Sequence, residues 1–215
     1  MAGYIVPTIW MAAPKLSNGI LPSKQEAIAF WQMWPVWVSI FQYAMTKIMG
    51  AGAGSVYPKT GPIQVRSGLQ FLYGFAFLCA SLPHIACWTI SLSAVAFPTL
   101  FSPDILPLLM PNAVFQNKFP WSPEQPESLG VGALWFLQWD HLCCTVTALV
   151  WAVTLYESAH LTNGQSVDKS TLALKVITFT LIAGVAGAAV ELMWERDQFL
   201  LDLEVTEVNK AVKRE

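Results

Sequence analysis

Long apolar stretches alternate with short charged or proline-rich stretches along this chain, and their lengths predict helices that cross a membrane. A helix needs about 20 mainly apolar residues to span the hydrocarbon core of a bilayer. Four stretches have this length: residues 27–49, 69–98, 131–156 and 171–194. We therefore expect an all-α fold, a polytopic transmembrane helical bundle with about four spans, which forms a single membrane domain over residues 1–215.

The stretch between the second and third predicted spans is unusually rich in proline. Six prolines lie between residues 101 and 130: Pro103, Pro107, Pro111, Pro120, Pro123 and Pro126. Proline lacks a backbone N–H group and clashes with the preceding helical turn, so this stretch cannot form a regular spanning helix. We expect a long loop that dips into the mouth of the bundle. Within the second span, Pro83 is expected to kink the helix.

The two ends of the chain differ from the predicted spans. Residues 4–14 are apolar but short and have no basic segment before them, which favours an interfacial or re-entrant piece over a signal peptide. Residues 195–215 are charged, with apolar residues at helical spacing, and predict an amphipathic helix. Lys and Arg are nearly balanced between the two sides of the bundle, so the orientation in the membrane stays open.

Composition supports the membrane interpretation and excludes several other classes. The chain is 54% hydrophobic and 12% charged, its net charge is −2, and it has no Lys/Arg-rich run, which argues against nucleic-acid binding. The four cysteines lack paired C-x-x-C spacing and lie in apolar stretches, so we expect small buried side chains and neither a disulfide framework nor a zinc site: Cys79, Cys87, Cys143 and Cys144. There is also no D-D-x-x-D run for magnesium, and no cofactor is expected.

Polar residues inside a predicted span must point into the bundle, because lipid does not solvate them. Asp140 lies near the middle of the third span, where a bare carboxylate costs about 2.5 to 3.5 kcal/mol. Such surroundings favour the neutral acid, which can donate a proton, so Asp140 is our main catalytic candidate. The alternative is a cross-helix hydrogen bond from Asp140 to a glutamine or histidine. In the fourth span, Thr180, Gly184 and Ala188 form a small-xxx-small seam that predicts close helix packing.

Three further residues are catalytic candidates: His84, His141 and Glu191. His84 follows Pro83, whose kink frees backbone groups and opens the local packing. A structural hydrogen bond explains each histidine equally well. Glu191 lies near the end of the fourth span, where extension of its side chain to water is the alternative.

The chain has ten tryptophans, and several lie within the predicted spans rather than at their ends. The face of an indole ring stabilises a cation by up to about 2 kcal/mol in a site without water, although packing is the commoner role. We therefore predict a substrate-binding set formed by Trp31, Trp34, Trp88, Trp139 and Trp151, with Gln138 beside them.

An apolar pocket with one acid, many aromatic rings and few fixed positive charges suits chemistry that passes through a carbocation. The acid would protonate an epoxide or alkene, the rings would stabilise the cation, and a histidine or carboxylate would take the final proton. No metal ion is needed for this route.

Two short segments resemble a known family. Residues 30–37, FWQMWPVW, and residues 137–140, LQWD, are similar to segments of small integral-membrane proteins of fungal secondary-metabolite clusters, among them membrane-bound terpene cyclases of meroterpenoid and indole-diterpene pathways. The resemblance implies cyclase or isomerase activity on an apolar prenylated, often epoxidised, intermediate, with Asp140 as the suspected acid. It also implies a multi-pass protein of the endoplasmic reticulum membrane.

Two alternatives remain open at the level of sequence. A non-catalytic integral membrane protein, such as a transport component, scaffold or partner subunit, would use its polar stripes only for helix packing and would bind another membrane protein. A haem-binding electron carrier would use His84 and His141 as axial ligands. The expected partners of the cyclase are the lipid bilayer and an apolar small molecule.

Overall fold

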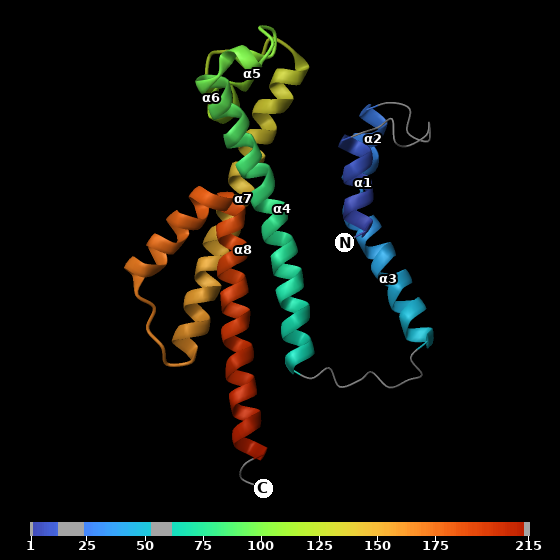
Figure 1. Cartoon of the computed structure of the whole chain (residues 1–215), viewed down its shortest axis with the longest axis vertical. Coiled ribbons are helices and arrows are strands. Elements are labelled where there is room, and N and C mark those ends of the chain that lie inside the picture. Colours follow the sequence, from blue (N-terminus) through green and yellow to red (C-terminus); the bar gives the residue numbers. More distant parts are fainter. Residues whose placement is uncertain (1, 13–23, 53–61, 213–215) are drawn as a thin grey trace. The chain divides into compact units, whose positions relative to one another are not determined.

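The computed structural model describes residues 2–12, 24–52 and 62–212, and nearly all of its regular structure is α-helical (Figure 1). The chain divides into two compact units, Met1–Thr60 and Gly61–Glu215. A single membrane domain over the whole chain stays a prediction.

The first unit contains three helices, α1 (Ala2–Ala12), α2 (Lys24–Gln32) and α3 (Trp34–Gly52), and α1 packs against the other two. The first predicted span, 27–49, is therefore not one helix, because the chain turns at Met33 between α2 and α3. Pro35 explains the interruption, since proline has no N–H group and its ring displaces the carbonyl of Trp31 four residues earlier. The helices meet closely at Gly3, where an added Cβ atom would lie 2.7 Å from the carbonyl oxygen of Trp37.

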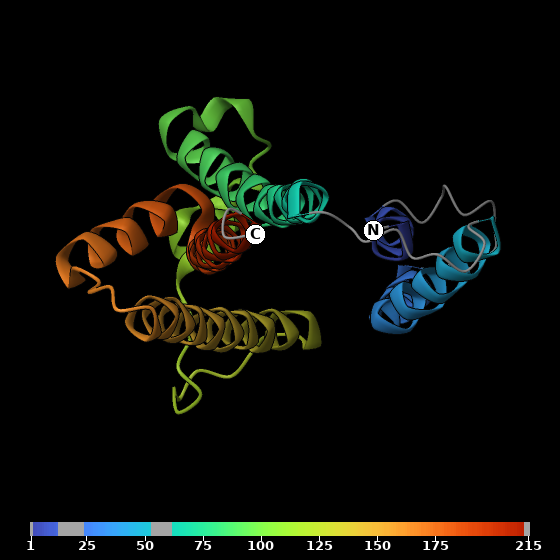
Figure 2. The ribbon, with the colours of Figure 1, turned by 90° about the horizontal axis from the view of Figure 1, so that it is seen from below.

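The second unit is built on three long helices, α4 (Pro62–Ala96), α7 (Leu129–Thr162) and α8 (Lys169–Val212). α4 and α7 each pack against α8 (Figure 2). In the described part of the chain, three helices are long and apolar enough to cross a membrane, and they lie in these elements: Val65–Ala96, Leu129–Thr162 and Lys169–Thr206. They contain the third and fourth predicted spans and all but the last two residues of the second. α4 is a continuous helix through Pro83.

The helix α8 folds back on itself at Gly184, whose φ of 76° and ψ of 171° are not helical. The side chains of Lys175 and Glu195 form a salt bridge, although a straight helix would separate residues twenty apart by about 30 Å. Leu172 and Leu192 also belong to one apolar cluster, together with Ala152 of α7.

α8 thus consists of a first arm, residues 169–183, and a second arm, residues 185–212 (Figure 1). The first arm is about 22 Å long, shorter than the roughly 30 Å of a hydrocarbon core. The predicted fourth span, 171–194, is therefore interrupted by a bend, and Gly184 forms this bend rather than part of a packing seam. Beyond it, α8 stays helical through the predicted tail as far as Val212.

The proline-rich stretch between α4 and α7 holds only short helices: η2 (Pro98–Leu100), α5 (Leu106–Leu109) and α6 (Pro111–Phe115). All three contact α4. α7 then begins after Ser128, whose hydroxyl oxygen accepts a hydrogen bond from the N–H group of Val131 at 3.3 Å and caps the helix. The proline-rich stretch thus packs on α4 and leads directly into α7.

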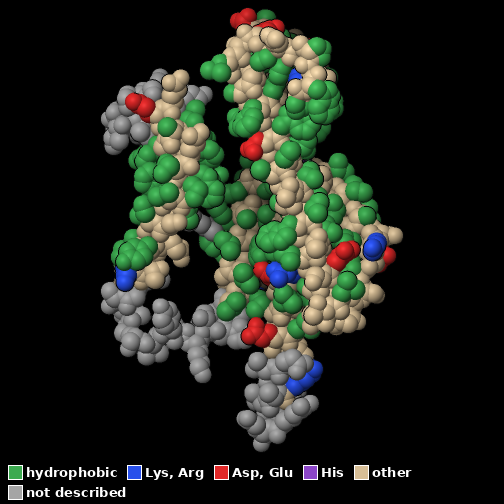
Figure 3. All heavy atoms as spheres, turned by 180° about the vertical axis from the view of Figure 1, so that it is seen from behind, with side chains coloured by type: hydrophobic (Ala, Val, Ile, Leu, Met, Phe, Trp, Pro, Cys, Tyr) green, Lys and Arg blue, Asp and Glu red, His purple; other side chains and the backbone are tan. Residues whose placement is uncertain are grey.

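Few side chains of the described residues are fully buried, and apolar side chains cover much of the surface (Figure 3). Leu82 on α4 and Phe136 on α7 are 60% and 69% exposed. Such faces are typical of helices whose surroundings are lipid or further apolar protein. The prediction that the four cysteines are buried is wrong, because all four are exposed and free on these same two helices.

Candidate functional site

A groove of about 640 Å³ lies among α4, α6, α7 and α8 in the second unit. Its volume falls in the range of small-molecule sites in proteins, about 300 to 1,000 Å³. The lining is mainly apolar, and among the described residues that form it there is no Lys, Arg, Asp or Glu. Two histidines line it, His84 from α4 and His141 from α7. The groove is therefore a candidate site for an apolar ligand.

Aromatic side chains form one wall of the groove. The ring of Trp88 stacks on that of Phe115 from α6, with ring centroids 4.2 Å apart and an angle of 22° between the planes. The ring of His84 meets the ring of Trp88 edge-on at 6.3 Å, one helical turn earlier on α4. The proline-rich stretch thus contributes to the groove through α6, although the sequence analysis placed none of its residues in the site.

The bend in α8 forms the opposite wall. Nε2 of His84 lies 3.1 Å from the carbonyl oxygen of Leu181, just before the bend. A Cβ atom at Gly184 would lie 3.0 Å from Nδ1 of His84. Glycine at this position therefore permits both the positive φ angle and the close approach of the histidine ring.

The third wall comes from α7 through His141, Leu142 and Thr145. The hydroxyl group of Thr145 donates to the carbonyl oxygen of His141 at 2.8 Å, so it is satisfied within its own helix. Asp140 does not line the groove. Its carboxylate accepts a weak hydrogen bond from the thiol of Cys144 at 3.7 Å and is exposed on a neighbouring face of α7.

Gln138 and Trp139 hold the proline-rich stretch against α7. The amide Nε2 of Gln138 donates to the carbonyl oxygen of Val114 at 3.0 Å, and Nε1 of Trp139 donates to that of Lys118 at 2.6 Å. Trp139 also lines a smaller hollow of about 290 Å³ together with Trp135. These two predicted substrate-binding residues therefore position α6, which carries Phe115 into the groove.

Of the remaining predicted tryptophans, Trp31 and Trp34 belong to the first unit and Trp151 belongs to α7. In the first unit, Nε1 of Trp31 donates to the hydroxyl oxygen of Thr8 at 3.1 Å, and Trp34 meets the ring of Tyr4 edge-on. Trp151 on α7 is 61% exposed. The contacts of Trp31 and Trp34 match the packing role that we weighed against cation stabilisation.

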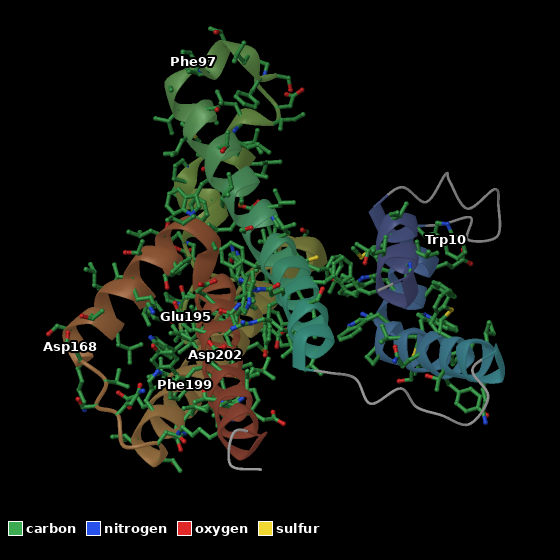
Figure 4. All side chains as sticks on the ribbon, turned by 60° about the horizontal axis from the view of Figure 1, so that its bottom comes forward. Trp10, Phe97, Asp168, Glu195, Phe199 and Asp202 are labelled. Atoms are coloured by element: carbon green, nitrogen blue, oxygen red, sulfur yellow. The ribbon has the colours of Figure 1, made fainter. Side chains whose placement is uncertain are left out.

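Glu191, a predicted catalytic residue, belongs to a charged cluster between the two arms of α8. It lies within electrostatic reach of Lys175 and Glu195, which form the salt bridge between the arms. Figure 4 labels Glu195 on the second arm. Asp168 caps the start of the first arm at its far end. This cluster holds the arms together and is not part of the groove.

The structure therefore brings together three of the ten predicted site residues: His84, Trp88 and His141. The bend at Gly184 was missed as a site element. A signal for it exists, because Gly184 and Gly187 lie three residues apart within one apolar stretch, where each glycine disfavours a helix by about 1 kcal/mol. A Cβ atom at Gly187 would lie 2.4 Å from that of Ala183 across the bend. Among the described residues, no cluster of three or more His, Cys, Asp or Glu side chains could hold a metal ion.

Comparison with known proteins places the chain in a family. The family model described as the CtvD domain matches residues 1–201. The chain is 36% identical over 197 residues to terpene cyclase ctvD of Aspergillus terreus, which covers 92% of this chain and 52% of that protein. It is 30% identical to terpene cyclase ascI of Acremonium egyptiacum, over 98% of this chain and 52% of the relative, and 30% identical to terpene cyclase atmA of Aspergillus flavus, over 90% and 51%. The chain thus spans about half the length of these relatives. No solved structure matches it significantly.

Proposed function

This chain belongs to the CtvD domain family, and from that premise we propose that it is a membrane-bound terpene cyclase. Its substrate is an apolar prenylated, epoxidised intermediate of fungal secondary metabolism, which it converts to a cyclic isomer through a carbocation. Its site of action is the membrane of the endoplasmic reticulum. The observation that carries the proposal is the groove, which joins an apolar lining to an aromatic wall and two histidines.

The lining of the groove suits a cationic reaction. The stacked rings of Trp88 and Phe115 present π-electron density, which attracts a developing positive charge most strongly where water is excluded. A lysine or arginine in the lining would repel that charge, and the described lining contains neither. The apolar remainder of the lining would bury the prenyl chain and keep water from the cation.

The proposed reaction begins with proton transfer to the epoxide oxygen. The C–O bond then breaks, and an alkene of the prenyl chain attacks the cationic carbon to form a ring. Loss of a proton from the carbon beside the final cation gives an alkene, so the product is an isomer of the substrate. Asp140 is our proposed acid. Because its carboxylate lies outside the groove lining, on a neighbouring face of α7, the epoxide end of the substrate must extend beyond the groove to meet it. Either groove histidine has the chemistry of the final base.

Product analysis in microsomes that contain the chain tests this proposal. Microsomes given candidate prenyl epoxides should form cyclised product, and Asp140→Asn should lower its rate by about 10²- to 10⁴-fold, the usual contribution of a general acid. Glu157→Gln, a carboxyl-to-amide change on the same helix, is the matched control and should leave the rate unchanged. Equal rates for Asp140→Asn and the native chain would show that Asp140 is not the acid. A native chain that converts no candidate epoxide would contradict the function.

A non-catalytic role in a membrane complex is the second candidate, and the exposed apolar faces of α4 and α7 favour it. In that case Asp140→Asn would change assembly or abundance while no substrate turns over. Because Asp140 bonds to Cys144 of its own helix, this effect would come from a bond to a helix of the partner protein, worth about 0.6 to 1.7 kcal/mol in a membrane. A Soret band in the purified chain would instead favour the haem-carrier hypothesis.

A further inference from the structure

We infer that the bend of α8 at Gly184 fixes one tautomer of His84 and thereby makes Nδ1 of this ring the base that ends the proposed cyclisation. The inference rests on the proposed function and deepens it, because it chooses between the two histidines of the groove. It assigns the reacting atom to His84, and it assigns positioning roles to Leu181 and Gly184.

The hydrogen-bond partner of the His84 ring determines which of its two nitrogens carries the hydrogen. Nε2 of His84 lies 3.1 Å from the carbonyl oxygen of Leu181, and a carbonyl oxygen has no hydrogen to donate. Nε2 must therefore carry the hydrogen. In the neutral ring the other nitrogen, Nδ1, then holds a free lone pair and can accept a proton.

The bend explains why this carbonyl meets a side chain of another helix. In a regular helix the carbonyl of Leu181 would accept from the N–H group of Val185, four residues later. Gly184 lies between these two residues, and its φ and ψ leave the helical region there. Broken helices inside membranes need such replacement partners for their freed backbone groups, and His84 from α4 supplies one.

Gly184 also leaves room for the ring of His84 at its Nδ1 side. Any larger residue would place its Cβ atom 3.0 Å from Nδ1, so the ring would have to move. His84 and Gly184 both line the groove, beside the aromatic wall of Trp88. A cation held against that wall would carry its acidic C–H bonds next to the histidine ring.

The step balances as a proton transfer. The C–H bond beside the cationic carbon breaks, its electron pair becomes the new alkene, and the proton goes to Nδ1. The resulting imidazolium ring still donates from Nε2 to the carbonyl of Leu181, and this charge-assisted bond stabilises it. Among the described residues the ring of His141 forms no hydrogen bond, so nothing selects its tautomer.

Two substitutions distinguish a catalytic base at His84 from a residue that only donates a structural hydrogen bond. His84→Gln keeps an N–H group that can reach the carbonyl of Leu181 but lacks a basic nitrogen, whereas His84→Phe removes both. We expect both variants to consume substrate but to form alcohols by capture of water, or other alkenes, with the share of the native alkene lowered at least about tenfold. His160→Gln, at the histidine of α7 that lies outside the groove, should leave the product ratio unchanged. A native product ratio in His84→Gln would overturn the inference, because a structural donor is restored by glutamine.

The tautomer has its own measurement, independent of turnover. Nitrogen NMR of the histidine-labelled chain in detergent, with the His84 signals assigned from His84→Gln, should show Nε2 protonated and Nδ1 bare. A native chain that cyclises substrate while Nδ1 carries the hydrogen would overturn this inference and leave the proposed function standing. A native chain that forms no cyclised product would overturn both, whatever tautomer it shows.

Discussion

Lys175 and Glu195 form a salt bridge although they are twenty positions apart along α8. The contact exists because α8 turns back at Gly184, so that its two arms diverge from the bend as an open V and Lys175 reaches across it (Figure 1). The same reversal places Thr180 and Val185 on either side of the bend in one wall of the groove. The salt bridge and the candidate site are thus two consequences of one backbone feature.

Gly184→Ala should destabilise the chain strongly. The φ and ψ of Gly184 lie in a region that is essentially restricted to glycine, where another residue costs about 1 to 3 kcal/mol, and the new Cβ atom would press on the ring of His84. Unfolding in detergent measures the loss. Gly74→Ala is the control, because a Cβ atom there would meet open space within a helix, so this change should be neutral or stabilising by up to about 1 kcal/mol. Equal stabilities of the two variants would contradict the bend.

The salt bridge between Lys175 and Glu195 should contribute more than an exposed pair. Both side chains are about two-thirds buried, so a double-mutant cycle with Lys175→Met and Glu195→Gln should give a coupling of about 1 to 3 kcal/mol. Arg66 and Asp202, which link α4 to α8 at 2.5 Å, provide the comparison. Their side chains are 46% and 59% exposed, so their cycle should give about 0.2 to 1 kcal/mol. A coupling of Lys175 and Glu195 near zero would mean that the arms do not meet in solution.

Asp168 should make the start of α8 sensitive to acid. The hydroxyl group of Thr171 and the N–H groups of Thr171 and Ser170 donate to its carboxylate and lower its pKa below the ordinary value of 3.8. Because the folded pKa is depressed, this contribution to stability is fully present above about pH 4 and is lost as the pH falls through the lowered value.

Asp168→Asn keeps a side-chain oxygen as the cap but carries no charge. The stability advantage of the native chain over this variant should therefore shrink between about pH 5 and pH 2, as unfolding measured at several pH values would show. The other carboxylates titrate equally in both chains and cancel in the difference. A constant difference over this range would rule out the proposed role of the carboxylate.

Trp139→Phe should loosen the proline-rich stretch. The change keeps an aromatic ring but removes the hydrogen bond to the carbonyl of Lys118, worth about 0.5 to 1.5 kcal/mol. Hydrogen exchange should become faster in residues 116–124, with little change in the arms of α8. Trp151→Phe, at an exposed position on the same helix, should leave exchange in this stretch as it is in the native chain. Unchanged exchange in Trp139→Phe would show that this bond does not anchor the stretch.

The sequence predicted the helical elements better than their arrangement. The lengths of the apolar stretches place α4 and α7 correctly, because a long uncharged stretch has few other ways to satisfy its backbone in lipid. The break before α3 was missed because residues 27–49 were judged by their apolar length, although Pro35 among them is a helix breaker. The predicted burial of the cysteines failed because apolar neighbours in the sequence do not show which helix face another helix covers.

The candidate site was predicted in part. His84, Trp88 and His141 were chosen for their chemistry, and they meet in the groove because α4 and α7 both pack on α8. Asp140 lies one residue from His141 but on another face, and the helical period of 3.6 residues turns adjacent side chains by about 100°. Which face of α7 points to the groove depends on the packing of α8.

The sequence by itself determined the class of this protein, an all-helical chain with stretches apolar enough for a membrane, because hydropathy and helix length are local properties. The tertiary structure alone decided where the site lies. Glycine adopts helical and positive φ angles with similar ease, so the sequence is equally compatible with Gly184 as a packing residue within a helix or as a bend. The salt bridge between Lys175 and Glu195 and the bond from His84 to Leu181 select the bend, and both are contacts between distant parts of the chain.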